Sequence, residues 1–176
     1  MQIASVLHGR SSTPCLVGVF VDELPARIEQ ILRSVPLDLV QLHGNEPSQL
    51  LRRLSPRAFK ALRPRSHDEA RQRIEEYGRA LDATIPAFIV DAFDGTRYGG
   101  TGVCGDWDIA AAIARRYPIL LAGGLTSQNV ADAIRYVRPW GVDVSTGVER
   151  APGLKDHTRV REFIGEARKV GQGEKE

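Results

Sequence analysis

The chain has 176 residues, 42% of them hydrophobic and 26% charged, which is the size and composition of one globular domain with a sizeable core. Its 24 basic and 22 acidic residues leave a net charge of +2, which disfavours a nucleic-acid partner. No apolar run is long enough to cross a bilayer, the N-terminus lacks a signal-peptide pattern, and the cysteines and histidines show no metal-ligand spacing. We therefore expect a cytoplasmic protein without membrane contact, disulfide framework or metal site.

Six short apolar runs predict buried strands, and the amphipathic stretches between them predict helices. The centres of consecutive runs are about 20 to 32 residues apart, which suits one strand–helix unit each. In chain order, the expected strands cover residues 16–21, 39–42, 59–62, 87–90, 119–122 and 142–144. The expected helices begin at Pro25, Pro47, Ser66, Trp107, Thr126 and Lys155. We expect one domain over residues 1–170 and a polar tail over residues 171–176.

This alternation predicts a parallel sheet, because parallel strands need helical crossovers between them. Two arrangements satisfy the pattern: an open doubly wound sheet and a (β/α)8 barrel. Residues 1–7 are typical of the end of a further helix, which suggests that one or more elements precede the first strand.

Residues 100–105 match the G-x-G-x-x-G pattern of dinucleotide-binding loops. In that fingerprint the glycines directly follow a strand and open a helix, and an acidic residue lies about 20 positions on. Here residues 92–99 separate the pattern from its strand, and position 125 is a leucine. A glycine-rich loop at an active site is the better interpretation, and no nucleotide cofactor is predicted.

The loops after the last two strands predict a phosphate site. Gly123 and Gly124 follow the fifth strand, and Ser145, Thr146 and Gly147 follow the sixth. Backbone N–H groups near helix starts attract anions, and glycine lets a phosphate approach closely. In (β/α)8 barrels the final two loops commonly bind phosphate. Tight turns with positive φ are the alternative reason for such glycines.

Three aspartates lie at strand ends, where barrel chemistry takes place. Asp91 ends the fourth strand, Asp143 lies on the last and Asp22 ends the first. Apolar neighbours would raise the pKa of Asp91 and keep it protonated, as a general acid needs. Several carboxyl groups in one mouth would also raise one another's pKa. A turn-forming aspartate is the alternative interpretation of Asp91.

Other polar side chains near strand ends remain open between two interpretations. His43 follows the second strand and either donates to a substrate oxygen or belongs to a loop beside a helix start. Arg63 and Arg65 either bind an anion or are solvated charges. Cys15 precedes its strand, at the opposite end of the sheet, and Cys104 lies in the glycine-rich loop.

Taken together, these strings resemble the phosphoribosylanthranilate isomerase family of tryptophan biosynthesis. The resemblance covers residues 17–164, nearly the whole chain. The segments that carry it are residues 17–21 (VGVFV), 40–44 (VQLHG), Asp91, 99–107 (GGTGVCGDW), 121–126 (LAGGLT), 129–130 (NV), 137–139 (VRP), 141–149 (GVDVSTGVE) and 152–156 (PGLKD).

The resemblance implies a (β/α)8 barrel without cofactor or metal and a small-molecule substrate, N-(5'-phosphoribosyl)anthranilate. It implies an Amadori rearrangement in which an aspartic acid opens the ribose ring to a Schiff base and a cysteine base removes the C2' proton. The acid corresponds to Asp91, and the phosphate-binding loops correspond to the two glycine-containing loops above. His43 and Asp143 match positions that line the mouth and bind substrate.

The chain also departs from the family pattern. The family's cysteine base lies in a Lys-Ile-Cys-Gly string on its first strand, which is absent here, and neither remaining cysteine corresponds to it. The second strand and its loop, with an arginine near the anthranilate carboxylate, are absent too. About 35 to 50 residues are missing by ordinary element lengths. Two explanations stay open: the start of this reading frame is placed too far downstream and the natural protein is complete, or the gene is a degraded fragment.

Two functions follow as hypotheses. The first is the isomerase, with weak or no activity in these 176 residues because the cysteine base is missing. The second is a non-catalytic phosphate-binding barrel fragment that needs an N-terminal segment for completion. The oligomeric state does not follow from the sequence.

Overall fold

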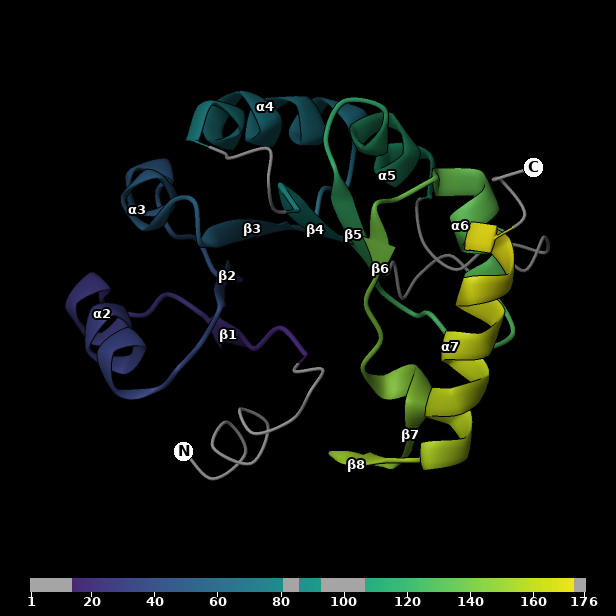
Figure 1. Cartoon of the computed structure of the whole chain (residues 1–176). Helices are drawn as coiled ribbons and strands as arrows, with labels where there is room; N and C mark the ends of the chain where they lie inside the picture. Colours follow the sequence, from purple (N-terminus) through teal and green to yellow (C-terminus); the bar gives the residue numbers. More distant parts are fainter. Residues whose placement is uncertain (1–13, 81–85, 93–106, 173–176) are drawn as a thin grey trace.

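Six parallel strands form one sheet that curls into an open half barrel, with helices on its outer side (Figure 1). The computed structural model describes residues 14–80, 86–92 and 107–172. The strands are β1 (Val17–Phe20), β2 (Leu39–Leu42), β3 (Ala58–Leu62), β4 (Phe88–Asp91), β5 (Ile119–Ala122) and β6 (Gly141–Val142). They pair in sequence order, all parallel. This order confirms the barrel-type arrangement and excludes the doubly wound one, whose strand order reverses.

Helices follow the strands as the sequence predicts. They are α2 (Pro25–Ser34), α3 (Ser48–Leu54), α4 (His67–Tyr77), α5 (Trp107–Ala114), α6 (Val130–Val137) and α7 (His157–Gln172). Short 3-10 turns cover η1 (Gly78–Ala80) and η2 (Thr146–Val148), and β7 (Glu149–Ala151) pairs with β8 (Leu154–Lys155) in an antiparallel hairpin. Residues 1–7, predicted as a helix end, and the glycine-rich loop with Cys104 lie outside the described residues.

Local hydrogen bonds explain where the helices begin. The Ser66 hydroxyl accepts from the Glu69 amide at 3.1 Å and caps α4, as predicted. The helix predicted from Thr126 begins only at Val130, because residues 126–129 form a turn in which the Asn129 side chain accepts from the Thr126 amide. The helix predicted from Lys155 begins at His157, because Lys155 belongs to β8.

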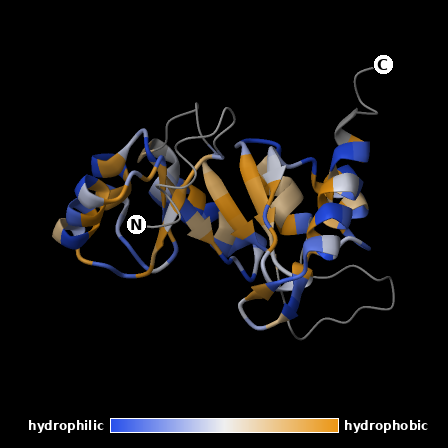
Figure 2. Ribbon diagram, turned by 60° about the horizontal axis from the view of Figure 1, so that its bottom comes forward, coloured by the Kyte–Doolittle hydropathy of each residue, from blue (hydrophilic) through white to orange (hydrophobic). Residues whose placement is uncertain are grey.

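The sheet has two apolar faces. Its outer face packs against the helices in the main core, which includes Val40, Leu42, Phe88 and Leu121. Its inner face carries a smaller cluster of Phe59, Ala61, Ile89 and Ala122. Figure 2 shows the hydrophobic strands between helices whose outward residues are hydrophilic. Side chains alternate between the faces because successive residues of a strand point to opposite sides.

The first strand shows the open side of the half barrel. Val17, Val19 and Val21 are 39%, 58% and 64% exposed, whereas Phe20 between them is 8% exposed and belongs to the main core. Alternation therefore puts these valines on the inner face. Within the described part of the chain, β1 and β6 are the two edges of the sheet. No helix in that part has the length and hydropathy needed to cross a membrane.

Candidate active site

The carboxyl ends of the parallel strands bring the predicted polar residues to one edge of the sheet. His43 directly follows β2, Arg63 follows β3, Asp91 is the last residue of β4, and Asp143 follows β6. Strands β2, β3 and β4 are neighbours, about 4.8 Å apart. Residues that are 48 positions apart in the sequence, from 43 to 91, therefore meet in one mouth.

Arg63 lies at the centre of this mouth and contacts two of the predicted site residues. Its Nε is 3.0 Å from Oδ2 of Asp91, and its Nη2 is 2.6 Å from Nε2 of His43. The Arg63 side chain is 64% exposed, whereas that of Asp91 is 23% exposed. From the sequence, Arg63 could either bind an anion or be a solvated charge. Only its position after β3, beside β4, could have indicated that it contacts Asp91 and His43.

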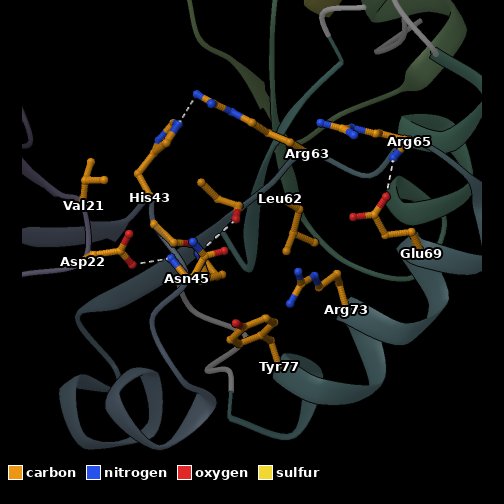
Figure 3. A pocket seen from close by; sticks show the side chains of 13 residues that line it. Val21, Asp22, His43, Asn45, Leu62, Arg63, Arg65, Glu69, Arg73 and Tyr77 are labelled. Carbon is orange, nitrogen blue, oxygen red and sulfur yellow. Dashed lines mark hydrogen bonds between the residues drawn. The ribbon is translucent and has the colours of Figure 1, made fainter.

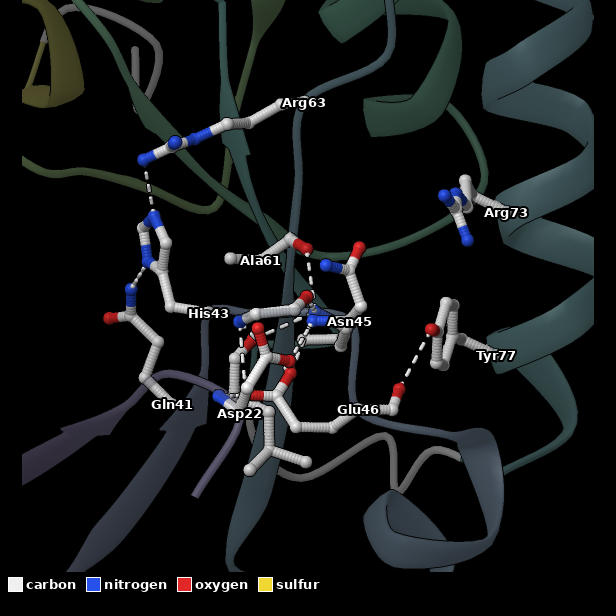
Figure 4. A network of polar contacts seen from close by, with 12 residues as sticks. Asp22, Gln41, His43, Asn45, Glu46, Ala61, Arg63, Arg73 and Tyr77 are labelled. Atoms are coloured by element: carbon white, nitrogen blue, oxygen red, sulfur yellow. Dashed lines mark hydrogen bonds and ion pairs between the residues drawn. The ribbon is translucent and has the colours of Figure 1, made fainter.

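The His43 ring is held as a neutral hydrogen-bond acceptor. Burial lowers the pKa of His43 below 6.5, and the Arg63 cation lowers the pKa further. A guanidinium has only donors, so Nε2 of His43 accepts from Arg63 and the ring proton lies on Nδ1. Nδ1 lies 2.5 Å from Nε2 of Gln41 (Figure 4); because this NH2 group is itself a donor, a proton on Nδ1 requires the Gln41 amide to be turned so that its oxygen accepts. In this structure His43 is therefore oriented from both sides.

The Asp143 carboxyl group is affected by its surroundings in the mouth. The pKa of Asp143 is raised because protein atoms exclude part of its water, and the Asp91 carboxylate raises it further. This confirms for Asp143 the predicted effect of several carboxyl groups in one mouth. The sequence predicted apolar neighbours for Asp91. The structure instead places the guanidinium of Arg63, which follows β3, beside its carboxyl group.

The two predicted phosphate loops pack directly on each other. Gly123 and Gly124 have φ values of 97° and 62°, which favour glycine. A Cβ on Gly147 would lie 1.9 Å from the backbone oxygen of Leu125, so only glycine allows this approach. The Asn129 side chain donates to the Gly124 oxygen at 3.0 Å and fixes the first loop. Positive φ and close packing therefore both account for these glycines.

A lysine holds the second of these loops. Nζ of Lys155 lies 2.8 Å from the Ser145 backbone oxygen and 2.8 Å from Oε1 of Glu149. Ser145 and Thr146 are exposed and open η2. The cation of Lys155 thus lies beside the loop predicted to bind phosphate; the sequence did not assign this residue a role.

Two further residues singled out by the sequence, Asp22 and Cys15, lie at opposite ends of β1. Oδ1 of Asp22 accepts from the Asn45 amide at 2.5 Å, so the structure brings Asp22 to the β2–α3 loop. Cys15 is exposed and precedes β1, at the amino end of the sheet. Among the residues that the structure describes, no group of three His, Cys, Asp or Glu side chains could hold a metal ion.

A cavity of about 410 Å³ opens beside His43 and Arg63 (Figure 3). It extends from the ends of β1 to β3 towards α4, and basic side chains contribute much of its polar wall. The residues that line it are Val21, Asp22, His43, Gly44, Asn45, Lys60, Ala61, Leu62, Arg63, Arg65, Glu69, Arg73 and Tyr77.

Comparison with known proteins assigns the family. The family model described as N-(5'phosphoribosyl)anthranilate (PRA) isomerase matches residues 2–166. A relative from Roseiflexus sp. (strain RS-1), named N-(5'-phosphoribosyl)anthranilate isomerase, is 48% identical over 158 residues, which are 89% of this chain and 71% of the relative. A relative of the same name from Geobacter sulfurreducens is 42% identical over 167 residues, which are 95% of this chain and 79% of the relative.

Solved structures agree. The phosphoribosyl anthranilate isomerase from Thermotoga maritima superposes with a TM-score of 0.77 at 34% identity, over 94% of this chain and 78% of that one. A second isomerase structure, in complex with reduced 1-(o-carboxyphenylamino)-1-deoxyribulose 5-phosphate, gives a TM-score of 0.75 at 32% identity, over 94% of this chain and 77% of that one. The predicted resemblance is therefore confirmed: the chain belongs to the N-(5'-phosphoribosyl)anthranilate isomerase family of tryptophan biosynthesis.

Proposed function

We propose that Asp91 is the general acid with which this protein isomerises N-(5'-phosphoribosyl)anthranilate. In this aldose-to-ketose rearrangement, a proton given to the furanose oxygen opens the ring and leaves a Schiff base at C1'. Loss of the C2' proton then gives an enolamine, which tautomerises to the ketone. A carboxyl group within reach of the ring oxygen supplies the first proton.

One observation carries this assignment: β4, which ends in Asp91, lies between β2 and β3 on one side and β5 and β6 on the other. The loops after β5 and β6 are the proposed phosphate site, and β2 and β3 end in His43 and Arg63. Since neighbouring strands are about 4.8 Å apart, a sugar phosphate anchored on those loops extends across β4. Its ring then lies over Asp91, with His43 and Asp143 at its sides as proposed substrate-binding residues.

The phosphate site is proposed to consist of backbone N–H groups from Gly123, Gly124, Ser145, Thr146 and Gly147. Two loops that follow neighbouring strands converge on one anion, and the Lys155 cation beside Ser145 favours negative charge there. Comparison with the family favours the isomerase over the alternative, a phosphate-binding fragment without catalysis.

The turnover of the chain tests the function. We expect these 176 residues to convert N-(5'-phosphoribosyl)anthranilate about 10² to 10⁴ times more slowly than the Roseiflexus relative, because neither cysteine corresponds to the family's base. The loss of anthranilate fluorescence measures the reaction. Turnover equal to that of the relative would show that a residue of this chain acts as the base. If the chain shows no turnover and also does not bind the reduced product analogue, the isomerase function is excluded for this chain.

Alanine at position 147 is expected to weaken phosphate binding. Its Cβ would lie 1.9 Å from the Leu125 oxygen, so the two loops must move apart. We expect the Kd of the reduced product analogue, measured by calorimetry, to rise at least tenfold, about 1.4 kcal/mol. Gly165→Ala is the matched control, because a Cβ there meets nothing within 4 Å. An unchanged Kd for Gly147→Ala would place the phosphate elsewhere.

A further inference from the structure

Two buried charged side chains pair beneath the mouth: Lys60 comes from β3, and Glu46, labelled in Figure 4, comes from the β2–α3 loop. The Lys60 side chain is 3% exposed and that of Glu46 is 2% exposed, and Nζ of Lys60 is 3.2 Å from Oε2 of Glu46. Neither has a role in the proposed reaction. Burying two charges is unfavourable unless they are paired and fully hydrogen-bonded, so the contacts of this pair decide what it does.

Lys60 holds the backbone on both sides of His43. Its Nζ is 2.6 Å from the Gly44 oxygen and 3.2 Å from the Leu42 oxygen, and these two residues flank His43 in the chain. A third bond, of 3.2 Å, goes to the oxygen of Ala61 on β3 itself. The ammonium group has three N–H donors, so its donors tie the end of β2 to the end of β3.

Glu46 completes the attachment from the other side. Its Oε1 accepts from the Asp22 amide and from the Gly44 amide, each at 3.0 Å. Its backbone oxygen accepts from the Tyr77 hydroxyl of α4 at 2.8 Å. The β2–α3 loop is therefore bonded to the end of β1, to β3 and to α4. The loop residues that make these bonds, Gly44 and Glu46, lie one and three positions after His43.

We propose that the Lys60–Glu46 pair is a positioning element for His43, which holds the β2–α3 loop so that the imidazole meets Arg63 at the mouth. The inference rests on the proposed substrate-binding role of His43. Apolar side chains in place of a buried ion pair often preserve stability, but they offer no donors to the two carbonyl groups that flank His43. The positioning role is therefore separable from a contribution to folding.

The test is a double variant, Lys60→Met/Glu46→Gln. It removes both charges together; Lys60 lowers the pKa of His43 and Glu46 raises it, so their direct electrostatic effects on the ring oppose each other. Arg63, Asp91 and Asp143 are the other charged groups that interact with the ring, and the double variant leaves all three unchanged. A change in the titration of His43, followed by NMR, then reports a change in its position.

We expect the pKa of His43 to rise towards 6.5 in the double variant, because the ring becomes more exposed to water and moves out of contact with Arg63. We expect kcat to fall at least tenfold, while the Kd of the reduced product analogue changes less than threefold, because β5 and β6 supply the phosphate site. Ile113→Ala in α5 is the matched control for lost stability, since Ile113 is 1% exposed and α5 packs on β5 and α6, at the other end of the sheet from β2.

An unchanged His43 titration and kcat in the folded double variant would overturn the proposal, as would equal effects in Ile113→Ala. Glu46→Gln alone is the second variant if the double variant does not fold, because glutamine keeps an acceptor for the Asp22 and Gly44 amides. Loss of the Glu46 charge alone directly lowers the pKa of His43, so a rise in this variant supports the proposal, and a fall or an unchanged pKa contradicts it. The NMR measurement needs no turnover, so failure of the isomerase assay leaves this test intact.

Discussion

Asparagine in place of Asp91 is expected to lower the turnover number by about 10²- to 10⁴-fold, the usual effect of removing a general acid or base. The amide keeps the size of the carboxyl group, and its oxygen can still accept from Nε of Arg63, which is 3.0 Å from Oδ2 of Asp91. It has no carboxyl proton for the furanose oxygen. A single-turnover assay of anthranilate fluorescence, which detects weak activity, measures the change.

Two controls make this result specific. Asp132→Asn is the same chemical change on the exposed face of α6, where the side chain is 72% exposed, and it should leave turnover unchanged. The Kd of the reduced product analogue should also change little in Asp91→Asn, because the phosphate contacts come from the loops after β5 and β6. Turnover of Asp91→Asn equal to that of the unchanged chain would remove the general-acid role from Asp91.

Methionine in place of Lys60 is expected to lower the free energy of unfolding by about 3–5 kcal/mol, because it leaves the Glu46 carboxylate buried without its cation. The side chains of Lys60 and Glu46 are 3% and 2% exposed, so water cannot replace the lost partner. The double variant Lys60→Met/Glu46→Gln should regain part of this loss, because no unpaired charge remains. Urea unfolding of the single and double variants measures the coupling between the two side chains.

The exposed pair of Arg135 and Asp132 provides the comparison. These side chains are 62% and 72% exposed, and exposed ion pairs contribute about 0–1 kcal/mol. Asp132→Asn should therefore barely change the urea midpoint. A loss in Lys60→Met as small as that of Asp132→Asn would mean that the buried pair does not stabilise the fold.

The same pair makes stability depend on acid pH. Burial by itself would raise the pKa of Glu46, but hydrogen bonds from backbone amides, including those of Asp22 and Gly44, and the Lys60 cation outweigh it and lower the pKa below 4.5. A carboxyl group with a lowered pKa in the folded state contributes stability above its unfolded pKa, and that contribution is lost as the pH falls through the lowered value. The urea midpoint should therefore decrease below about pH 4.5, and it should decrease less in Glu46→Gln.

Local sequence patterns determined the order and type of the elements. Short apolar runs such as residues 119–122 predicted strands that the structure confirms, and Ser66 with Glu69 three positions on predicted the cap of α4. These signals depend on residues a few positions apart, within one strand or one helical turn. The alternation of strands and helices then indicated a parallel sheet, and parallel order places all carboxyl ends at one edge. The candidate positions of Asp91, His43 and the two phosphate loops followed from that rule.

Only the tertiary structure decided which side chains meet at that edge. Arg63 contacts His43 and Asp91, which lie 20 and 28 positions away in the chain, and Lys60 reaches Glu46 14 positions back. The packing of Gly147 on Leu125 joins two loops across neighbouring strands. Such contacts depend on strand register and on the curvature of the sheet, which bring distant residues together without any local periodicity. The sequence therefore determined the chemistry that each strand end carries, and the three-dimensional fold determined the partners that each side chain has.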